Sequence, residues 1–361
     1  MDKIEQYEIN STNKRILFVD MAKGIGILSV IIAHIFPKDT YISQLVYTYL
    51  IPLFFICSGL IIKKHEGNSQ KIGRILKTNG YNFVLYFLIS LIYIAYDILI
   101  HGFILNTDKF VNLLKWDLLE SFTFFGINVL WFVITMSISK AFYEILNTYF
   151  HRNKLRHLVI FIISTITCFF GMIIDYYLGN NHSGFLAIVY FSLIGILRPF
   201  GLLIFLDIGN YIKNFIFKFC LEKRSLKTNI LIGLLLISFN FIFASSSGNI
   251  DWRFMKLGNI FIMFLLSVSG SVGILFICSV IENCSKIISD FLNLFGRNSL
   301  FIMIIHNYII IDLLFIFFMD FWCNVSYIVR FIIVLLLMYI LTLLFGRYFT
   351  KMIKVIKKVI S

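Results

Sequence analysis

The sequence predicts an all-α protein, a polytopic membrane helical bundle of about ten transmembrane helices with both termini in the cytoplasm. Of the 361 residues, 59% are apolar and only 14% are charged, whereas about a quarter of the residues of a soluble domain are charged. The apolar residues form blocks of about 20, the length that crosses a bilayer as a helix. These blocks are continuous rather than alternating, which excludes a transmembrane β-barrel.

Each predicted helix corresponds to one apolar block between polar loops. The spans are 16–36, 44–62, 80–100, 128–147, 157–178, 186–212, 230–244, 258–280, 298–319 and 326–346. The stretch that begins at Gly184 is too long for a single straight span, and Arg198-Pro199 interrupts it. Because proline cannot donate a helical hydrogen bond, we expect a kink or a re-entrant segment there.

The distribution of basic residues predicts the orientation of the helices. Alternate loops and the two termini hold 23 lysines and arginines, and the intervening loops hold five. Basic loops stay on the cytoplasmic side, so both termini are expected there. The loops leave no room for a second soluble domain, so 1–361 is predicted to be one membrane domain. Residues 1–15 form its cytoplasmic N-terminal segment, and 347–361 form a basic cytoplasmic tail that lies on anionic lipid.

Composition also limits the partners. The net charge of +13 could suggest a nucleic-acid partner, but no soluble segment carries a basic stripe with interleaved aromatic residues, so none is expected. The six cysteines are scattered without CxxC or Cys/His spacing, and no metal site is expected. The first fifteen residues are polar, so we expect the first apolar block to act as a signal anchor rather than a cleaved signal peptide.

The first predicted helix carries three polar residues that are costly inside a membrane. Asp20, Lys23 and His34 interrupt an otherwise apolar segment, and buried charges of this kind are usually paired and often functional. Lys23 and His34 are eleven residues apart, which places them on one helix face, within about 20° of each other. Asp20 lies one turn from Lys23, close enough to pair with it. The alternative is that Lys23 reaches the inner interface and His34 sits among the outer headgroups.

Other candidate residues have weaker signals. Ser58-Gly59 ends the second span, and such small pairs usually serve helix packing. The loop after it holds five cations, including Lys71 and Arg74; they could bind a phosphate-bearing donor or only fix topology. Trp131 begins the fourth span and could belong to an aromatic belt. His306 lies two turns into the ninth span, where a lone histidine is often only a buried bundle residue.

Taken together, these strings resemble the integral-membrane acyltransferase family 3, and most closely its fucose 4-O-acetylase-like subgroup. The resemblance lies in the order of the motifs as well as in their residues. They are Lys23 to His34 preceded by Arg15 and Asp20, then PLFFICSGLI, the basic pair Lys71 and Arg74, LWF at Trp131, and GRNSLFIMIIH ending at His306. The resemblance implies a bacterial inner-membrane enzyme, multi-pass in the cell membrane, that transfers an acetyl group from cytoplasmic acetyl-CoA to a sugar hydroxyl on the outer side.

That reaction gives each candidate a role. His34 suits the general base because its ordinary pKa lies near working pH; direct transfer and a transient acyl-histidine both remain open. Lys23 and Arg15 would stabilise the donor's charge, with Asp20 orienting Lys23. Further expected contacts are Lys71 and Arg74 to the CoA phosphates, and Trp131, His306 and Ser58 to the substrate cavity. Contacts to the sugar or polysaccharide acceptor are expected in 179–212, where the resemblance is poorest.

Two other functions remain possible from the residues alone. A transporter or flippase for a polar or lipid-linked solute would also place charges inside a ten-helix bundle, although no repeated halves are visible. A structural or assembly protein would tolerate replacement of Lys23 and His34.

Overall fold

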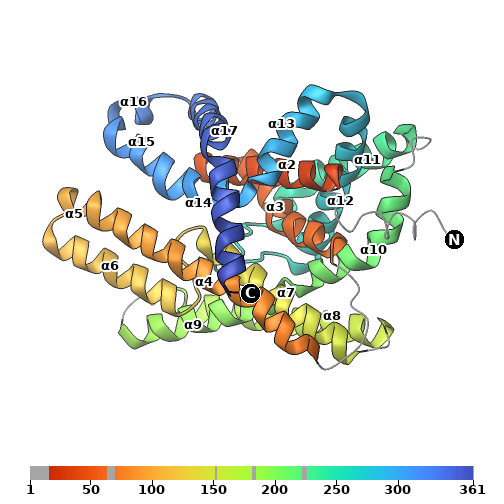
Figure 1. The fold of residues 1–361 in the computed structure, drawn as a ribbon, viewed down its shortest axis with the longest axis horizontal. Helices are drawn as coiled ribbons and strands as arrows, with labels where there is room; N and C mark the ends of the chain where they lie inside the picture. Colours follow the sequence, from red (N-terminus) through yellow and green to blue (C-terminus); the bar gives the residue numbers. More distant parts are fainter. Residues whose placement is uncertain (1–15, 63–69, 151–152, 181–183, 222–225, 361) are drawn as a thin grey trace.

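A computed structural model gives the structure of the protein and describes residues 16–62, 70–150, 153–180, 184–221 and 226–360. The protein is 88% helical without strands in the part described, apart from one isolated β-bridge between Asp251 and Lys256. The predicted all-α class is confirmed (Figure 1).

The helices follow one another with short connections. The first half comprises α2 (Leu17–Ile35), α3 (Tyr41–Leu60), α4 (Gln70–Leu99), α5 (His101–Ile104), α6 (Thr107–Phe122), α7 (Leu130–Tyr149) and α8 (Asn153–Leu178). The second half comprises α9 (Gly184–Gly201), α10 (Leu203–Leu221), α11 (Leu226–Phe243), the 3₁₀ turn η2 (Ala244–Ser247), α12 (Ile260–Cys284) and α13 (Lys286–Arg297). The chain ends with α14 (Ser299–Ile305), the π-helical turn η3 (His306–Ile311), α15 (Asp312–Phe317), α16 (Met319–Asn324) and α17 (Tyr327–Ile360).

Nine helical segments in the described ranges are long and apolar enough to cross a membrane, whereas ten were predicted. The missing one is the predicted span 128–147. Its helix forms as α7, but Lys140 and Glu144 make it less apolar than the others. Because α7 packs against α4, α9 and α10, it lies inside the bundle and does not need a surface suited to lipid.

Two segments expected as loops are helical. Within 101–127 the chain forms α5 and α6, and α6 begins with Asn106 accepting a hydrogen bond from the backbone of Lys109. Within 281–297 it forms α13, whose apolar residues lie on one face against α2. A helix that is apolar on one face only has a low average hydropathy. A search for continuous apolar blocks therefore does not find such helices.

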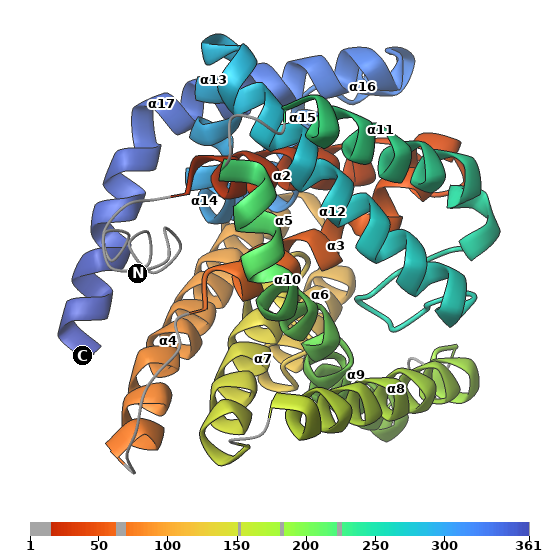
Figure 2. The same ribbon diagram turned by 90° about the vertical axis from the view of Figure 1, so that its right-hand side faces the viewer.

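The predicted interruption near Arg198-Pro199 is present. α9 ends at Gly201 and α10 begins at Leu203, and the two directions differ (Figure 2). The guanidinium of Arg198 is completely buried beside this break. It donates to the Thr135 hydroxyl at 2.8 Å and to the Arg253 carbonyl at 2.9 Å. The break is therefore held from the side by a buried cation with several acceptors.

α2 and α3 lie at the centre of the bundle. In their most apolar stretches 67% and 72% of the residues are buried, against 17% in α17, so α17 presents far more of its surface to lipid. α2 approaches α13 very closely: a Cβ atom on Gly24 would lie 2.2 Å from the Leu292 carbonyl oxygen, and one on Gly296 would lie 1.7 Å from that of Asp20. Glycine at both positions lets the two backbones meet, and this contact places the polar stripe of α2 next to the ninth predicted span.

Candidate active site

The two histidines selected from the sequence, His34 and His306, lie against each other. His34 is in the last turn of α2, and His306 opens the π-helical turn η3. Their ring centroids are 5.2 Å apart and the ring planes are inclined by 57°. The His34 side chain is exposed and that of His306 is fully buried. One imidazole is therefore exposed, and the other packs against it from inside the protein.

The His306 ring is fixed by its own helix. Its Nδ1 lies 3.0 Å from the Ile302 carbonyl oxygen and 2.9 Å from that of Met303. Carbonyl oxygens only accept hydrogen bonds, so Nδ1 carries the hydrogen and Nε2 presents a lone pair. Nε2 is buried and has no hydrogen-bond partner among the described residues. An unsatisfied acceptor of this kind is costly, and such π-helical turns often occur at functional sites.

A charged group lies at the other end of the α2 stripe. A carboxylate oxygen of Asp20 is 3.8 Å from Nζ of Lys23, as the spacing predicted, and the other is 3.6 Å from Nε of Arg297. Arg297 belongs to the GRNSLFIMIIH string, but nothing in its sequence context predicts a role for it. The segment from Arg297 to His306 therefore touches α2 twice, once at Asp20 and once at His34, which connects the two ends of the stripe.

Lys140 is a further cation near this charged group that sequence reasoning missed. It lies in α7, within electrostatic reach of Lys23. Its signal was present in the sequence as a lysine in the middle of a predicted span, a position where charges are rare.

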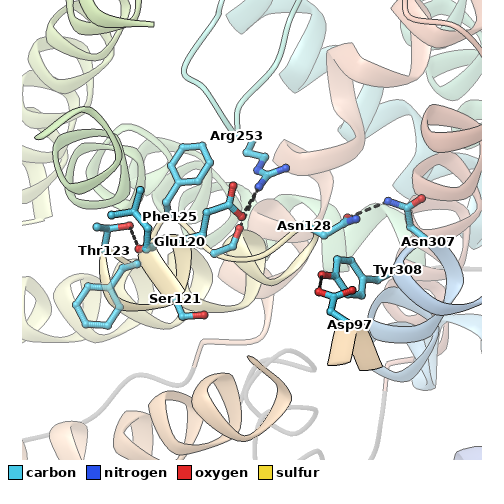
Figure 3. A network of polar contacts seen from close by, with 12 residues as sticks. Asp97, Glu120, Ser121, Thr123, Phe125, Asn128, Arg253, Asn307 and Tyr308 are labelled. Atoms are coloured by element: carbon cyan, nitrogen blue, oxygen red, sulfur yellow. Dashed lines mark hydrogen bonds and ion pairs between the residues drawn. The ribbon is translucent and has the colours of Figure 1, made fainter. Parts of the chain in front are cut away.

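Trp131 lies under a cation rather than in an aromatic belt. The guanidinium of Arg198 is 4.8 Å from the centroid of the indole ring, a distance at which cation–π attraction is effective. The loop before α7 also reaches the residue after His306, because the Asn307 amide donates to Asn128 at 2.9 Å (Figure 3). The segment that leads into Trp131 therefore contacts the turn η3 that His306 opens.

Arg253 was not among the candidate site residues predicted from the sequence. Its guanidinium donates to Glu120 Oε2 at 2.8 Å and to the Gly126 carbonyl at 3.3 Å (Figure 3). Burial raises the pKa of the Glu120 carboxyl, and the charges of Arg253 and Arg198 oppose that rise. Arg253 is also within electrostatic reach of His34. It is therefore, with Lys38, one of two side-chain cations in the described part of the chain whose charge acts on the exposed histidine.

The remaining predicted site residues lie elsewhere or outside the described residues. Ser58 is buried near the end of α3, next to Gly59, which packs on the Leu206 carbonyl; this location fits helix packing. Arg15 is outside the described residues. Lys71 and Arg74 begin α4, but their side chains are also outside the described part.

Comparison with known families decides the class of protein. Residues 16–347 match the model of the family described as an acyltransferase domain, acyltransferase family 3. The chain belongs to this family. The match extends over nearly the whole chain, from the residue before α2 into α17, and includes the paired histidines and the Asp20 group of this acyltransferase. No curated protein and no solved structure matches the chain. The fucose 4-O-acetylase-like subgroup stays a prediction.

Proposed function

We propose that this membrane acyltransferase transfers an acetyl group from cytoplasmic acetyl-CoA to a hydroxyl of an extracytoplasmic or lipid-linked sugar, and so modifies a cell-surface polysaccharide. The contact between His34 and His306 carries the proposal. It places an exposed imidazole, the side-chain type most often used as a general base, in ring contact with a buried imidazole that is fixed by its own helix.

In the proposed step, neutral His34 accepts the proton of the sugar hydroxyl while the hydroxyl oxygen bonds to the thioester carbonyl carbon. The tetrahedral intermediate then collapses, the C–S bond breaks, and the CoA sulfur takes the proton from His34. The products are an acetylated sugar and free CoA, and His34 is neutral again. Arg253 would stabilise the oxyanion by its charge, as preorganised donors do in acyl transfer.

The donor would bind at the opposite end of the stripe. Asp20 is shared between Lys23 and Arg297, so this group carries one net positive charge. Lys140 lies nearby in α7, where the charge of Glu144 opposes its own. Cations there would attract the anionic donor. Lys71 and Arg74, at the start of α4, would bind the CoA phosphates. The proposal therefore places the charged end of the donor beside Lys23, at the Asp20 end of α2, and the acceptor at the His34 end, about 16 Å from Lys23 along the helix. The thioester end of the donor would extend along α2 to reach His34.

The test is release of the free CoA thiol by detergent-purified protein supplied with acetyl-CoA and a pool of glycosides. His34→Ala should abolish the acceptor-dependent release while acetyl-CoA still binds. His157→Ala is the matched control, because His157 lies in α8 and pairs with Asp207, away from His34. Full activity in His34→Ala would refute the role of His34, and loss of activity in both variants would show only that histidine replacement damages the protein.

A further inference from the structure

A cavity of about 380 Å³ lies next to the end of α2 that carries His34. It is within the range of about 300–1,000 Å³ that is typical of small-molecule sites. Lys38, four residues after His34, forms part of the lining and is within electrostatic reach of the His34 ring. The rest of the lining comes from the start of α3, the end of α8 and the segment between η2 and α12.

The side chains of the lining suit a sugar. Asn180, Asn249 and Gln44 offer amide groups, each able to donate and accept, as sugar hydroxyls require. The amides of Asn180 and Asn249 are exposed and form no hydrogen bond with any residue that the structure describes. Tyr47 and Phe254 add aromatic faces, against which the apolar C–H face of a sugar ring can pack. A few polar groups on a partly aromatic wall are typical of a ligand site.

The charges in the lining are already compensated. Nζ of Lys38 is 2.7 Å from Asp251 Oδ2, and Nζ of Lys256 is 3.8 Å from Asp175 Oδ2. Each lysine therefore has its own carboxylate. An acidic sugar would bring a carboxylate to a site without an unpaired cation, and its loss of hydration would not be offset.

The hairpin that holds Asp251 is well defined. Asp251 and Lys256 exchange two backbone hydrogen bonds at 2.6 and 3.0 Å, and Asp251 Oδ1 accepts from the Arg253 backbone at 3.0 Å. The same hairpin therefore presents Asp251 and Phe254 to the cavity and carries Arg253, which donates to Glu120 and lies within electrostatic reach of His34. This arrangement connects recognition of the acceptor with the base.

We propose that this cavity binds the acceptor and selects an electrically neutral hexopyranoside over a uronic acid, with the reacting hydroxyl directed toward His34. The inference rests on the proposed acyltransferase function, and it assigns a substrate class and a set of specificity-determining residues to it. From the sequence we expected acceptor contacts in 179–212. Of that range, Gly179 and Asn180 line the cavity.

The test compares two probes that differ only at C6, methyl galactopyranoside and methyl galacturonide. Binding is measured by saturation-transfer NMR on the detergent-solubilised full chain without acetyl-CoA, so the result does not depend on turnover. The wild type should bind the neutral glycoside several-fold more tightly than the uronide. Equal or tighter binding of the uronide, or no binding of either probe at millimolar concentration, would overturn the proposal.

Two variants that change the charge of the cavity lining in opposite directions make the test specific. Asp251→Asn keeps an oxygen for the Arg253 backbone but leaves Lys38 unpaired, so it should improve uronide binding on the order of tenfold. Lys256→Gln leaves Asp175 unpaired and should weaken uronide binding by a similar factor. The readout is the ratio of uronide affinity to neutral-glycoside affinity, which should rise in Asp251→Asn and fall in Lys256→Gln whatever either variant does to binding of the neutral glycoside. A selectivity that does not change in either variant would contradict the assignment.

The inference and the proposed function can fail separately. If the probes bind as described but no acetyl group is transferred to any glycoside, the sugar site stands and the acyltransferase reaction falls. If transfer occurs, but neither variant changes the preference between neutral and acidic acceptors, the reaction stands and this cavity is not the acceptor site.

Discussion

Replacement of His306 separates its structural role from its role toward His34. Nδ1 of His306 is held by two backbone carbonyls, and Nε2 is the ring atom without a partner. The amide nitrogen of asparagine can occupy the place of Nδ1, whereas nothing in asparagine reaches the place of Nε2. His306→Asn therefore keeps the structural hydrogen bonds and removes both the unpartnered ring nitrogen and the ring that contacts His34.

The magnitudes follow from these contacts. Loss of a group that orients a catalytic residue typically lowers activity 10–100-fold, about 1.4–2.7 kcal/mol in the activation free energy. The free energy of unfolding should change by less than about 1 kcal/mol in His306→Asn, because the hydrogen bonds to the Ile302 and Met303 carbonyls are kept. His306→Ala loses those bonds and leaves a cavity, so it should lose about 3 kcal/mol as well as activity.

The assay measures kcat for CoA release, together with thermal unfolding of the same preparations. His306→Asn should be slow and stable, and His306→Ala should be slow and unstable. The reasoning would be refuted if His306→Asn retained wild-type kcat, since the buried Nε2 would then have no part in the reaction. Loss of stability in His306→Asn equal to that of His306→Ala would refute the assignment of Nδ1 as the structural donor.

The other predictions concern the charged groups. Asp20→Asn should leave Lys23 and Arg297 with unpaired like charges and lower stability by about 1 kcal/mol, and adding Arg297→Gln should restore part of it, as a thermal double-mutant cycle would show. Arg198→Gln should lower the free energy of unfolding by about 3–5 kcal/mol, because buried carbonyl acceptors lose their donors; unchanged thermal unfolding would contradict this. Burial, followed by the nearby Asp97, raises the pKa of the Asp117 carboxyl to about 8, above its unfolded value of about 3.9. The native state then holds an extra proton between these values, so stability should fall as the pH rises from about 4 to about 8. Asp117→Asn should reduce this slope, to which the raised pKa of Glu120 also contributes, in unfolding measured across that range.

Much of the fold follows directly from the sequence. Continuous apolar blocks predict the helical bundle and nine of its spans, because a bilayer demands about 20 apolar residues per helix. α7 was predicted as a span but is less apolar than the nine, since a helix surrounded by other helices tolerates Lys140 and Glu144. Helix α6 was missed for a related reason: only part of its surface is apolar, and a hydropathy pattern averages over the whole surface.

The candidate site was predictable only within single helices. Helical periodicity predicts that Asp20 pairs with Lys23, one turn away. In the structure Asp20 Oδ1 lies 3.8 Å from Lys23 Nζ. The contact between His34 and His306 depends on how α2 crosses α13 and α14. That crossing is set by close backbone approaches, such as the one at Gly24, which no periodicity reveals. Both histidines were selected, but their contact was not.

The arginines show a second limit. Arg198 was noticed only as part of a helix interruption, and Arg253 only as a charge in a loop. Their importance comes from acceptors far away in the chain, such as Glu120 for Arg253, 133 residues apart. Partners so distant in sequence leave no local pattern, so they had to be read from the structure.

The measurement that tests the central claim most directly is acceptor-dependent release of CoA thiol from acetyl-CoA by the purified protein, with wild type and His34→Ala compared at equal acetyl-CoA occupancy. We expect the wild type to release CoA thiol rapidly when a pool of neutral glycosides is added. His34→Ala should release it no faster than a control that contains no protein. Equal release by the two proteins, or failure of the folded wild type to bind acetyl-CoA at all, would contradict the account.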